Sequence, residues 1–282
     1  METMEHSLQG ATDIHVSVII STHNRSASLP ALLTCLEKQS LPKTSYEVVL
    51  VDDGSTDGTA QLLADYCRTA PLNITVVTAE EEGAPGARNT GVAHAKGTII
   101  AFTDDDCLPC EDWLEHGLPY FSTDSVVGVE GAIAPSASIA PPPSQYDHTP
   151  AILSRPSVVM GRTANMFYRR AVLDAIGGFD PCFVMPFGPK RSCREDTDLA
   201  WRALQHGDIP FAADALVLHP PRYVSAVQRI RLCKYKMLDV LLLKKHPGRF
   251  RQVLGFTFQA HYLSLFSLVW FGYGLLYFSL KQ

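Results

Sequence analysis

Short apolar runs alternate with helix-length segments along the first half of the chain. The runs that predict strands are Val16–Ser21, Tyr46–Val51, Asn73–Thr78 and Thr98–Thr103. The segment after the first run has the i, i+3, i+4, i+7 leucine spacing of a helix packed on a sheet, at Leu29, Leu32, Leu33 and Leu36. Alternating strands and helices indicate parallel βαβ units, so the pattern predicts an α/β fold with a mostly parallel sheet flanked by helices.

The second half of the chain is less regular. Ala134–Ser144 is rich in Pro, Ser and Ala, and this composition predicts a loop over a cleft. Order returns at Ala164–Arg169, and we expect a helix over about Glu195–His206 and a final strand over Phe211–Leu218. The chain has no internal repeat.

Three consecutive carboxylates end the fourth apolar run. Side chains alternate along an extended chain, so Asp104 and Asp106 point to one side and Asp105 to the other. Open α/β sheets bind ligands beyond the carboxyl ends of their strands. Two hard oxygen donors there suit a Mg²⁺ or Mn²⁺ ion that substrate phosphates also hold. A solvated acidic turn is the alternative for an isolated triple Asp.

Two further polar segments follow the second and third strands. A carboxylate such as Asp52 at a strand end can accept hydrogen bonds from a nucleobase or a ribose, whereas Asp57 is better explained as a cap of the next helix. Gly83–Gly91 opens a helix whose N-terminus and Arg88 can meet nucleotide phosphates. The chain contains neither GxGxxG nor GxxxxGKS, which removes the main support for dinucleotide and P-loop sites.

A third acidic segment begins the helix expected near Glu195. The helix dipole favours acids such as Glu195 and Asp196 in a first turn, which is the purely structural explanation. The dipole lowers a carboxylate pKa and crowding by other acids raises it. A partly buried carboxylate between these influences can serve as a general base.

Charge is unevenly distributed along the 282 residues. The formal net charge is −5, yet Arg222–Arg251 carries nine Lys or Arg and a single acid, Asp239. An acidic body argues against nucleic-acid binding, and the basic stretch favours an anionic membrane surface as partner. The seven cysteines show no framework spacing and indicate reduced cytoplasmic thiols, with Cys107 and Cys110 as a weak CxxC candidate for metal binding.

The C-terminal stretch is apolar. No Asp, Glu, Lys or Arg occurs from Gln252 to Leu280, and Ala260–Leu280 is long enough to cross a bilayer. The basic upstream flank would stay on the cytoplasmic side, which predicts the cytoplasmic face of the cell membrane as location. A helix packed on the domain or lying in the membrane interface is the alternative, supported by Gln259, His261, Gly272 and Gly274. Met1–His15 lacks the pattern of a signal peptide.

Six motifs taken together resemble the family 2 glycosyltransferases, enzymes with the Rossmann-like GT-A fold. They are Val16–Arg25, the Asp-Asp-Gly-Ser turn at 52–55, Ala87–Gly91, Asp104–Asp106, Gly177–Asp180 and Glu195–Leu199, in the family's order. The resemblance covers about residues 14–220. Together with the charge and hydropathy patterns, it predicts a tail at 1–13, a catalytic domain at 14–220, a basic amphipathic segment at 221–251 and a hydrophobic, membrane-associated tail at 252–282.

The resemblance also implies roles for individual residues. Ser21 and Asp53 would contact the base, and Asp104 and Asp106 would form the DxD pair that holds ribose and metal. Asn24, Asp52, Arg88 and Asp105 would lie near the nucleotide. His219 would be a further metal or phosphate ligand. Asp196 would be the catalytic base, with Asp198 and Glu195 as the neighbouring candidates.

The implied reaction is metal-dependent, inverting transfer from a nucleotide-diphosphate sugar to an acceptor hydroxyl. A UDP-sugar is the favoured donor, and a glycolipid, an envelope polysaccharide or another lipid-linked glycan is the expected acceptor. Two other classes compete with this interpretation. A nucleotidyltransferase would also use clustered acids and metal but would attack the α-phosphorus, and a non-catalytic nucleotide-sugar binder would be expected to lack one of the acids.

Overall fold

The computed structural model describes residues 15–136, 158–188, 190–220, 231–254 and 265–280. Within these residues one eight-stranded sheet runs through the protein, in the order β3-β2-β1-β4-β7-β6-β8-β5. Its strands are β1 (Val16–Thr22), β2 (Tyr46–Asp53), β3 (Ile74–Ala79), β4 (Ile99–Phe102), β5 (Leu108–Pro109), β6 (Gly128–Pro135), β7 (Met166–Arg169) and β8 (Phe211–His219). The predicted α/β class is confirmed.

The first four strands in sequence order form a parallel half-sheet. β1 pairs in parallel with β2 and β4, and β2 with β3, as the βαβ pattern predicts. The other half is mixed, because β7 runs antiparallel to β4 and β6, while β8 is parallel to β6 and antiparallel to β5. The carboxyl ends of β1, β2, β4 and β8 thus point to the same edge of the sheet.

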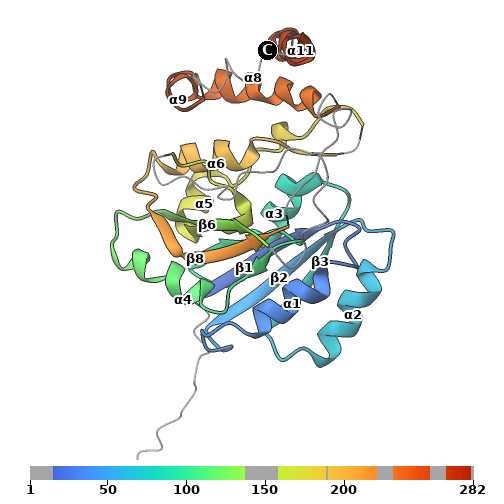
Figure 1. Ribbon diagram of the computed structural model, residues 1–282, viewed down its shortest axis with the longest axis vertical. Helices are drawn as coiled ribbons and strands as arrows, with labels where there is room; N and C mark the ends of the chain where they lie inside the picture. Colours follow the sequence, from blue (N-terminus) through green and yellow to red (C-terminus); the bar gives the residue numbers. More distant parts are fainter. Residues whose placement is uncertain (1–14, 137–157, 189, 221–230, 255–264, 281–282) are drawn as a thin grey trace, which may run out of the picture.

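Helices cover both faces of the sheet (Figure 1). They are α1 (Leu29–Glu37), α2 (Thr59–Thr69), α3 (Gly83–His94), α4 (Trp113–Gly117), α5 (Arg170–Ile176) and α6 (Glu195–Ala203), with short 3-10 turns at Pro119–Ser122, Thr163–Asn165 and Pro181–Phe183. The four leucines of α1 are buried with Val18 and Ile20 in one core. The alternate residue Ile19 faces a second core that contains Ala87 of α3, so each face of β1 is buried.

Helix α3 packs closely on the sheet at Gly91. A Cβ atom at this position would lie 2.5 Å from Ile19 Cγ2 and 3.2 Å from Val51 Cγ2. We expect Gly91→Ala to destabilise the fold by about 1–3 kcal/mol, because the overpacking exceeds the gain in helix propensity. The matched control is Gly272→Ala in α11 (Leu265–Leu280), where an added Cβ atom would have no described atom within 4 Å outside its own helix backbone, and the substitution should not destabilise. Urea unfolding of both variants measures the difference, and a Gly91→Ala variant as stable as wild type would contradict the packing argument.

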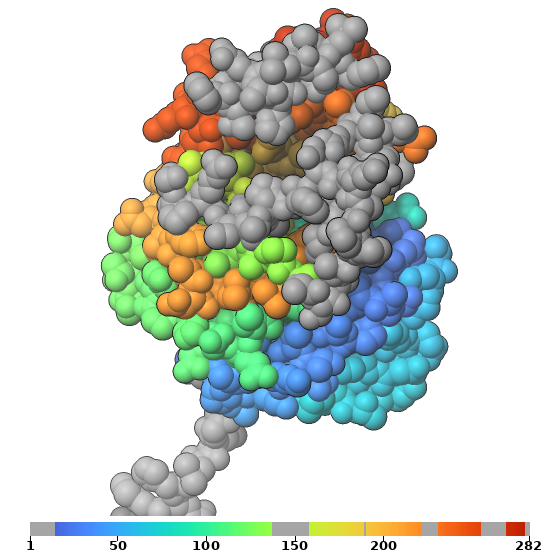
Figure 2. Space-filling model, in the orientation of Figure 1, coloured from blue at the N-terminus to red at the C-terminus, as the bar shows by residue number. Residues whose placement is uncertain are grey.

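Three C-terminal helices form a separate layer beside α6. They are α8 (Lys236–Lys245), α9 (Pro247–Val253) and α11, with a 3-10 turn at Cys233–Tyr235. Their apolar residues share a third core with Phe183 and Trp201. Figure 2 shows these orange and red residues gathered at one end of the molecule.

The hydrophobic tail packs against the protein where the structure describes it. A Cβ atom on Gly274 of α11 would lie 2.8 Å from Met237 Cα, and Lys244 Nζ donates to the Phe278 carbonyl at 2.7 Å. Helix α11 has 16 residues, and none of the helices in the described ranges is long and apolar enough to cross a membrane. The first part of the predicted span, 260–264, lies outside the described residues, as do 137–144 of the predicted loop and 221–230 of the basic segment.

Candidate active site

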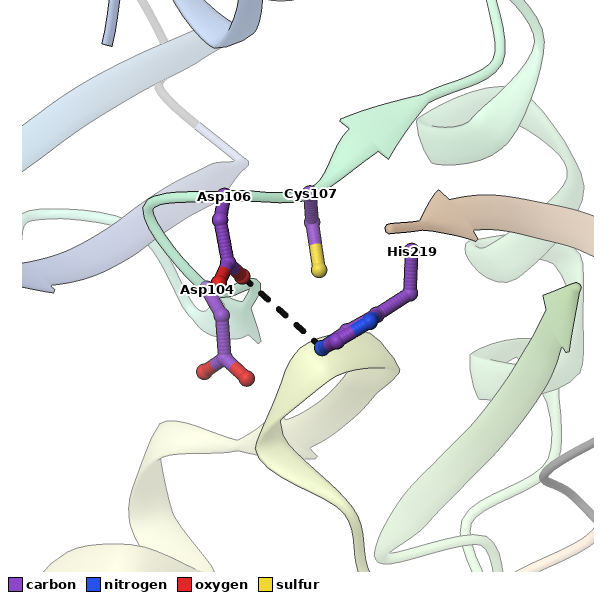
Figure 3. A group of neighbouring side chains, drawn as sticks. All are labelled: Asp104, Asp106, Cys107 and His219. Atoms are coloured by element: carbon purple, nitrogen blue, oxygen red, sulfur yellow. Dashed lines mark ion pairs between the residues drawn. The ribbon is translucent and has the colours of Figure 1, made fainter. Parts of the chain in front are cut away.

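An acidic cluster lies where β4 and β8 end. Asp104, Asp106, Cys107 and His219 each offer a ligand atom, and these atoms lie within 4.8 Å of one another (Figure 3). His219 Nε2 is 3.8 Å from Asp106 Oδ1. Asp105 is not part of this group and pairs with Arg25 Nε at 3.4 Å. The structure therefore brings the three predicted metal ligands together on one side of the turn.

Strand pairing explains why residues 112 positions apart in sequence meet here. β5 pairs with β8 so that Leu108 lies opposite Leu218. The residues next to this pair, Cys107 and His219, are thereby placed side by side. The sequence marks Cys107 only as half of a CxxC pair, but in the structure its side chain faces the acidic cluster (Figure 3). Burial, and then the charges of Asp104 and Asp106, raise the pKa of its thiol well above the ordinary value.

Arg88 links the acidic cluster to α6. Its guanidinium is buried and lies 3.2 Å from Asp104 Oδ1 and 3.1 Å from Glu195 Oε1. Ser192 Oγ also donates to Glu195 Oε1 at 2.8 Å. Glu195 thus holds Arg88, and the buried guanidinium connects the start of α6 to the cluster through two separate carboxylates.

The two other acids in the first turn of α6 differ in their surroundings. Burial, and then the neighbouring Glu195 carboxylate, raise the pKa of Asp196 to about 7. Asp198 is completely buried and receives bonds from Arg202, Lys245 and His246 at 2.8, 2.8 and 2.9 Å. Burial alone would raise the pKa of Asp198, but the bonds from His246 and Lys245 and the charge of Arg202 lower it to about 2.

These environments distinguish the two candidate bases. An acid with a pKa near neutrality can take a proton and release it again at physiological pH, so Asp196 has the property that a general base needs. Asp198 is a strongly paired anion that joins α6 to the C-terminal helices.

The predicted nucleotide residues lie at the ends of β1 and β2. Ser21 of β1 is paired with Val51 of β2. Asp52 and Asp53 are the last two residues of β2, and Asn24 lies just after the end of β1. Asp53 accepts hydrogen bonds from the Glu82 and Gly83 amides at 2.6 and 2.8 Å, which fixes the start of α3.

The loops after β1 and β2 are tied together by side-chain to backbone hydrogen bonds. Asp52 accepts from the Ser55 amide at 3.0 Å, and Asn24 accepts from the Thr56 amide at 2.7 Å. The N-cap of α2 is Gly58, and Asp57, one residue earlier, accepts from the amide of Thr59, the first residue of α2, at 2.9 Å. Asp57 thus holds the start of α2 as expected, but from the position before the N-cap. Because β1 also pairs with β4, these loops lie next to the acidic cluster.

Arg25 was not predicted as a site residue. Its guanidinium lies 3.4 Å from Asp105 and 3.6 Å from Asp106, so it joins the loop after β1 to the acidic turn. The one signal in the sequence is its place directly after the Ser-Thr-His-Asn segment that ends the first strand.

Comparison with known proteins identifies the family of this chain. The family model for glycosyl transferase family 2 matches residues 17–177. Glycosyltransferase AglE of Haloferax volcanii is 32% identical over 214 residues, which cover 73% of this chain and 67% of AglE. The chain spans about half, or less, of the length of the other curated relatives compared.

Two solved structures show the same fold. The mannosyltransferase PcManGT from Pyrobaculum calidifontis, in complex with GDP-Man and Mn²⁺, aligns over 95% of this chain and 76% of its own, with a TM-score of 0.63 and 22% identity. S. aureus TarS 1-349 in complex with UDP-GlcNAc aligns over 81% of this chain and 66% of its own, with a TM-score of 0.60 and 23% identity. The chain therefore has the GT-A fold and belongs to glycosyl transferase family 2.

Proposed function

We propose that this protein transfers a sugar from a nucleotide-diphosphate sugar to an acceptor hydroxyl, with inversion and with the help of a divalent cation. The observation that carries the proposal is the bridge formed by Arg88. It joins Asp104 of the acidic cluster to Glu195 at the start of α6. Arg88 would thereby fix the distance between the acidic cluster, which would bind the diphosphate leaving group, and the start of α6, which would supply the base.

The residues of the acidic cluster fit a divalent cation. Asp104 and Asp106 supply carboxylate oxygens and His219 an imidazole nitrogen, a donor set that suits Mn²⁺ or Mg²⁺. A cation bound there would neutralise negative charge on the departing diphosphate. The guanidinium groups of Arg25 and Arg88 lie beside Asp106 and Asp104, and these contacts support a cluster that faces positive charge.

The nucleotide would bind over the ends of β1 and β2. Asp53 and Ser21 would contact the base, with Asn24, Asp52 and Asp105 around it, and the charge of Arg88, next to Asp104, would attract the phosphates. A UDP-sugar is the favoured donor, and the UDP-GlcNAc complex of TarS supports this choice, although PcManGT binds GDP-Man.

The acceptor hydroxyl would be deprotonated by Asp196 while it attacks the anomeric carbon. A single displacement of this kind inverts the anomeric configuration. TarS is named a poly(ribitol-phosphate) β-N-acetylglucosaminyltransferase and AmsB an amylovoran biosynthesis glycosyltransferase. These names support an envelope polysaccharide or a lipid-linked glycan as the class of acceptor.

A donor panel tests the proposed function. The protein is incubated with UDP-, GDP- and dTDP-sugars in the presence of Mg²⁺ or Mn²⁺, and release of the nucleoside diphosphate is followed. We expect one donor to be hydrolysed measurably faster than the rest and only with metal. Binding of a donor without any turnover, even with candidate glycan acceptors, would instead favour a non-catalytic nucleotide-sugar binder.

We also propose that the C-terminal helices attach the protein to the cytoplasmic face of the cell membrane. Val269, Tyr273 and Leu276 are spaced i, i+4, i+7 on α11, and their side chains are 61%, 44% and 60% exposed. Exposed basic residues, Arg231 and Arg251, flank the same layer. Exposed apolar side chains beside basic ones fit a helix that lies on an anionic lipid surface.

Flotation with lipid vesicles tests this attachment. The full chain should float with vesicles that contain anionic lipid, and the double variant Leu275→Glu with Leu276→Glu should bind at least about tenfold more weakly, because each exposed leucine contributes about 1–3 kcal/mol when it enters the lipid. Asp124→Asn, an exposed change in the catalytic domain, serves as control and should float like wild type. If the wild-type chain stays unbound to anionic vesicles at low salt, the proposed attachment is wrong.

A further inference from the structure

The C-terminal helix α8 lies in the layer next to α6 (Figure 1). Two ion-pair contacts join it to the first turn of α6. Asp239, buried in α8, accepts a hydrogen bond from Arg194 Nε at 2.7 Å. One turn later in α6, Asp198 is bonded by Lys245 and His246 from the end of α8, at 2.8 and 2.9 Å. Since the Asp198 amide donates to the Arg194 carbonyl at 2.9 Å, both contacts hold the same helical turn.

Arg194 begins this turn in a strained backbone conformation. Its φ is +74°, in the left-handed region that residues with a Cβ adopt rarely. Such a conformation persists where surrounding contacts determine it, and the buried Asp239 carboxylate fixes the Arg194 side chain. Glu195 and Asp196 follow directly, so the direction in which Asp196 leaves the backbone depends on this turn.

The pair is not required merely to hold α8 in place. Met237, Leu238 and Leu242 of α8 are completely buried and share a core with Phe183 and Trp201. Apolar burial of this extent holds α8 on α6 by itself, and a buried ion pair adds little net stability compared with apolar residues of similar volume. What a buried pair with a short, directed hydrogen bond adds is a defined geometry.

We propose that Asp239 is a positioning residue for the base of the transfer reaction. By holding Arg194 it fixes the first turn of α6, and with it the place of Asp196 relative to the acidic cluster. This inference rests on the proposed function, because that function assigns Asp196 as the base. Helix α8 lies beyond residues 17–177, so the C-terminal helices of this chain would complete the active site from outside the segment that the family model matches.

Asp239→Asn and Arg194→Lys in the full chain test the proposal. Asn keeps the size of the side chain but removes its charge, and Lys keeps the charge of Arg194 but loses the fixed guanidinium geometry. Each should lower kcat by about 10-fold to 10²-fold through misplacement of the base, while calorimetric affinity for UDP with Mn²⁺ stays within about twofold of wild type. Lys236 Nζ also lies 3.3 Å from Asp239 Oδ2, so Asp239→Asn weakens two contacts and Arg194→Lys only one. The double variant should therefore be no worse than Asp239→Asn alone, because the contact between Arg194 and Asp239 is already lost there.

Hydrogen exchange supplies a readout that does not depend on activity. Amides of the first turn of α6 should exchange faster in both variants than in wild type. Lys244→Met, which removes the contact of α8 with the Phe278 carbonyl, is the matched control and should leave kcat and this exchange unchanged.

The outcomes distinguish a failure of the proposed function from a failure of the proposed role of Asp239. If wild type shows no transfer with any donor, the proposed function fails, while the exchange result still reports on the turn. Wild-type kcat and exchange in both variants would overturn the role of Asp239. So would an equal loss of kcat and UDP affinity together with a melting temperature far below that of Lys244→Met, because it would show a general loss of structure.

Discussion

Replacing Asp196 with Asn should lower kcat by about 10²-fold or more and leave donor affinity near that of wild type. Asn keeps the shape of the side chain but cannot take the proton from the attacking hydroxyl group. Asp53→Ala should have the opposite effect and weaken donor binding first, since Asp53 lies at the proposed base-binding loop and bonds the start of α3. Calorimetry for the donor and initial rates for turnover separate the two effects.

The pH dependence adds a second test of Asp196. Burial, and then Glu195, raise its pKa to about 7, and a base acts only when deprotonated. The value of kcat/KM should therefore fall about tenfold for each pH unit below that pKa, and the Asp196→Asn variant should lose this limb.

Asp198→Asn should instead destabilise the protein, because it removes the carboxylate that pairs with Arg202 and Lys245. Removing one partner of a buried ion pair costs about 3–5 kcal/mol. An active Asp196→Asn variant together with a folded but inactive Asp198→Asn variant would move the base to Asp198.

Replacing Asp106 with Asn should abolish metal-dependent turnover while the fold remains intact. Asp106 pairs only loosely with its protein neighbours, at 3.6 Å from Arg25 and 3.8 Å from His219, so little stability depends on it. A neutral amide cannot replace the charged Asp106 carboxylate as a metal ligand, so kcat should fall by about 10²-fold or more. Rates are measured with Mn²⁺, with Mg²⁺ and after chelation.

The matched control for this variant is Asp124→Asn, which removes an exposed carboxylate of the same domain. It should retain wild-type rates and metal dependence. Wild-type turnover that is insensitive to a chelator would refute the metal role of the acidic cluster, whatever the activity of the Asp106 variant.

The sequence predicted the parallel half of the sheet because its strands are buried on both faces. All eight residues of β2 are buried, and such strands appear as continuous apolar runs. Strand β6 was missed, because Gly128, Gly131 and its alanines form no such run. A Cβ atom on Gly131 would lie 2.3 Å from the Asn165 amide, so contacts with a distant side chain require glycine there.

The sequence predicted those site residues that directly follow a recognisable strand. Asp104 and Asp106 follow an apolar run directly, and alternation alone separates them from Asp105. The inward position of Cys107 depends on the pairing of β5 with β8, and the pairing of Arg194 with Asp239 joins residues 45 positions apart. A local sequence pattern cannot predict such contacts, because they join residues that are distant in sequence and meet only in the folded protein.

Identification of the nucleotide product tests the central claim most directly. The protein is supplied with its best nucleotide-sugar donor, Mn²⁺ and an acceptor glycan, and the products are analysed by ³¹P NMR and mass spectrometry. The account predicts a nucleoside diphosphate and an acceptor that is one sugar heavier, with inverted anomeric configuration. Release of a sugar 1-phosphate, with the nucleoside monophosphate group on the acceptor, would show attack at the α-phosphorus and contradict the assignment as a glycosyltransferase.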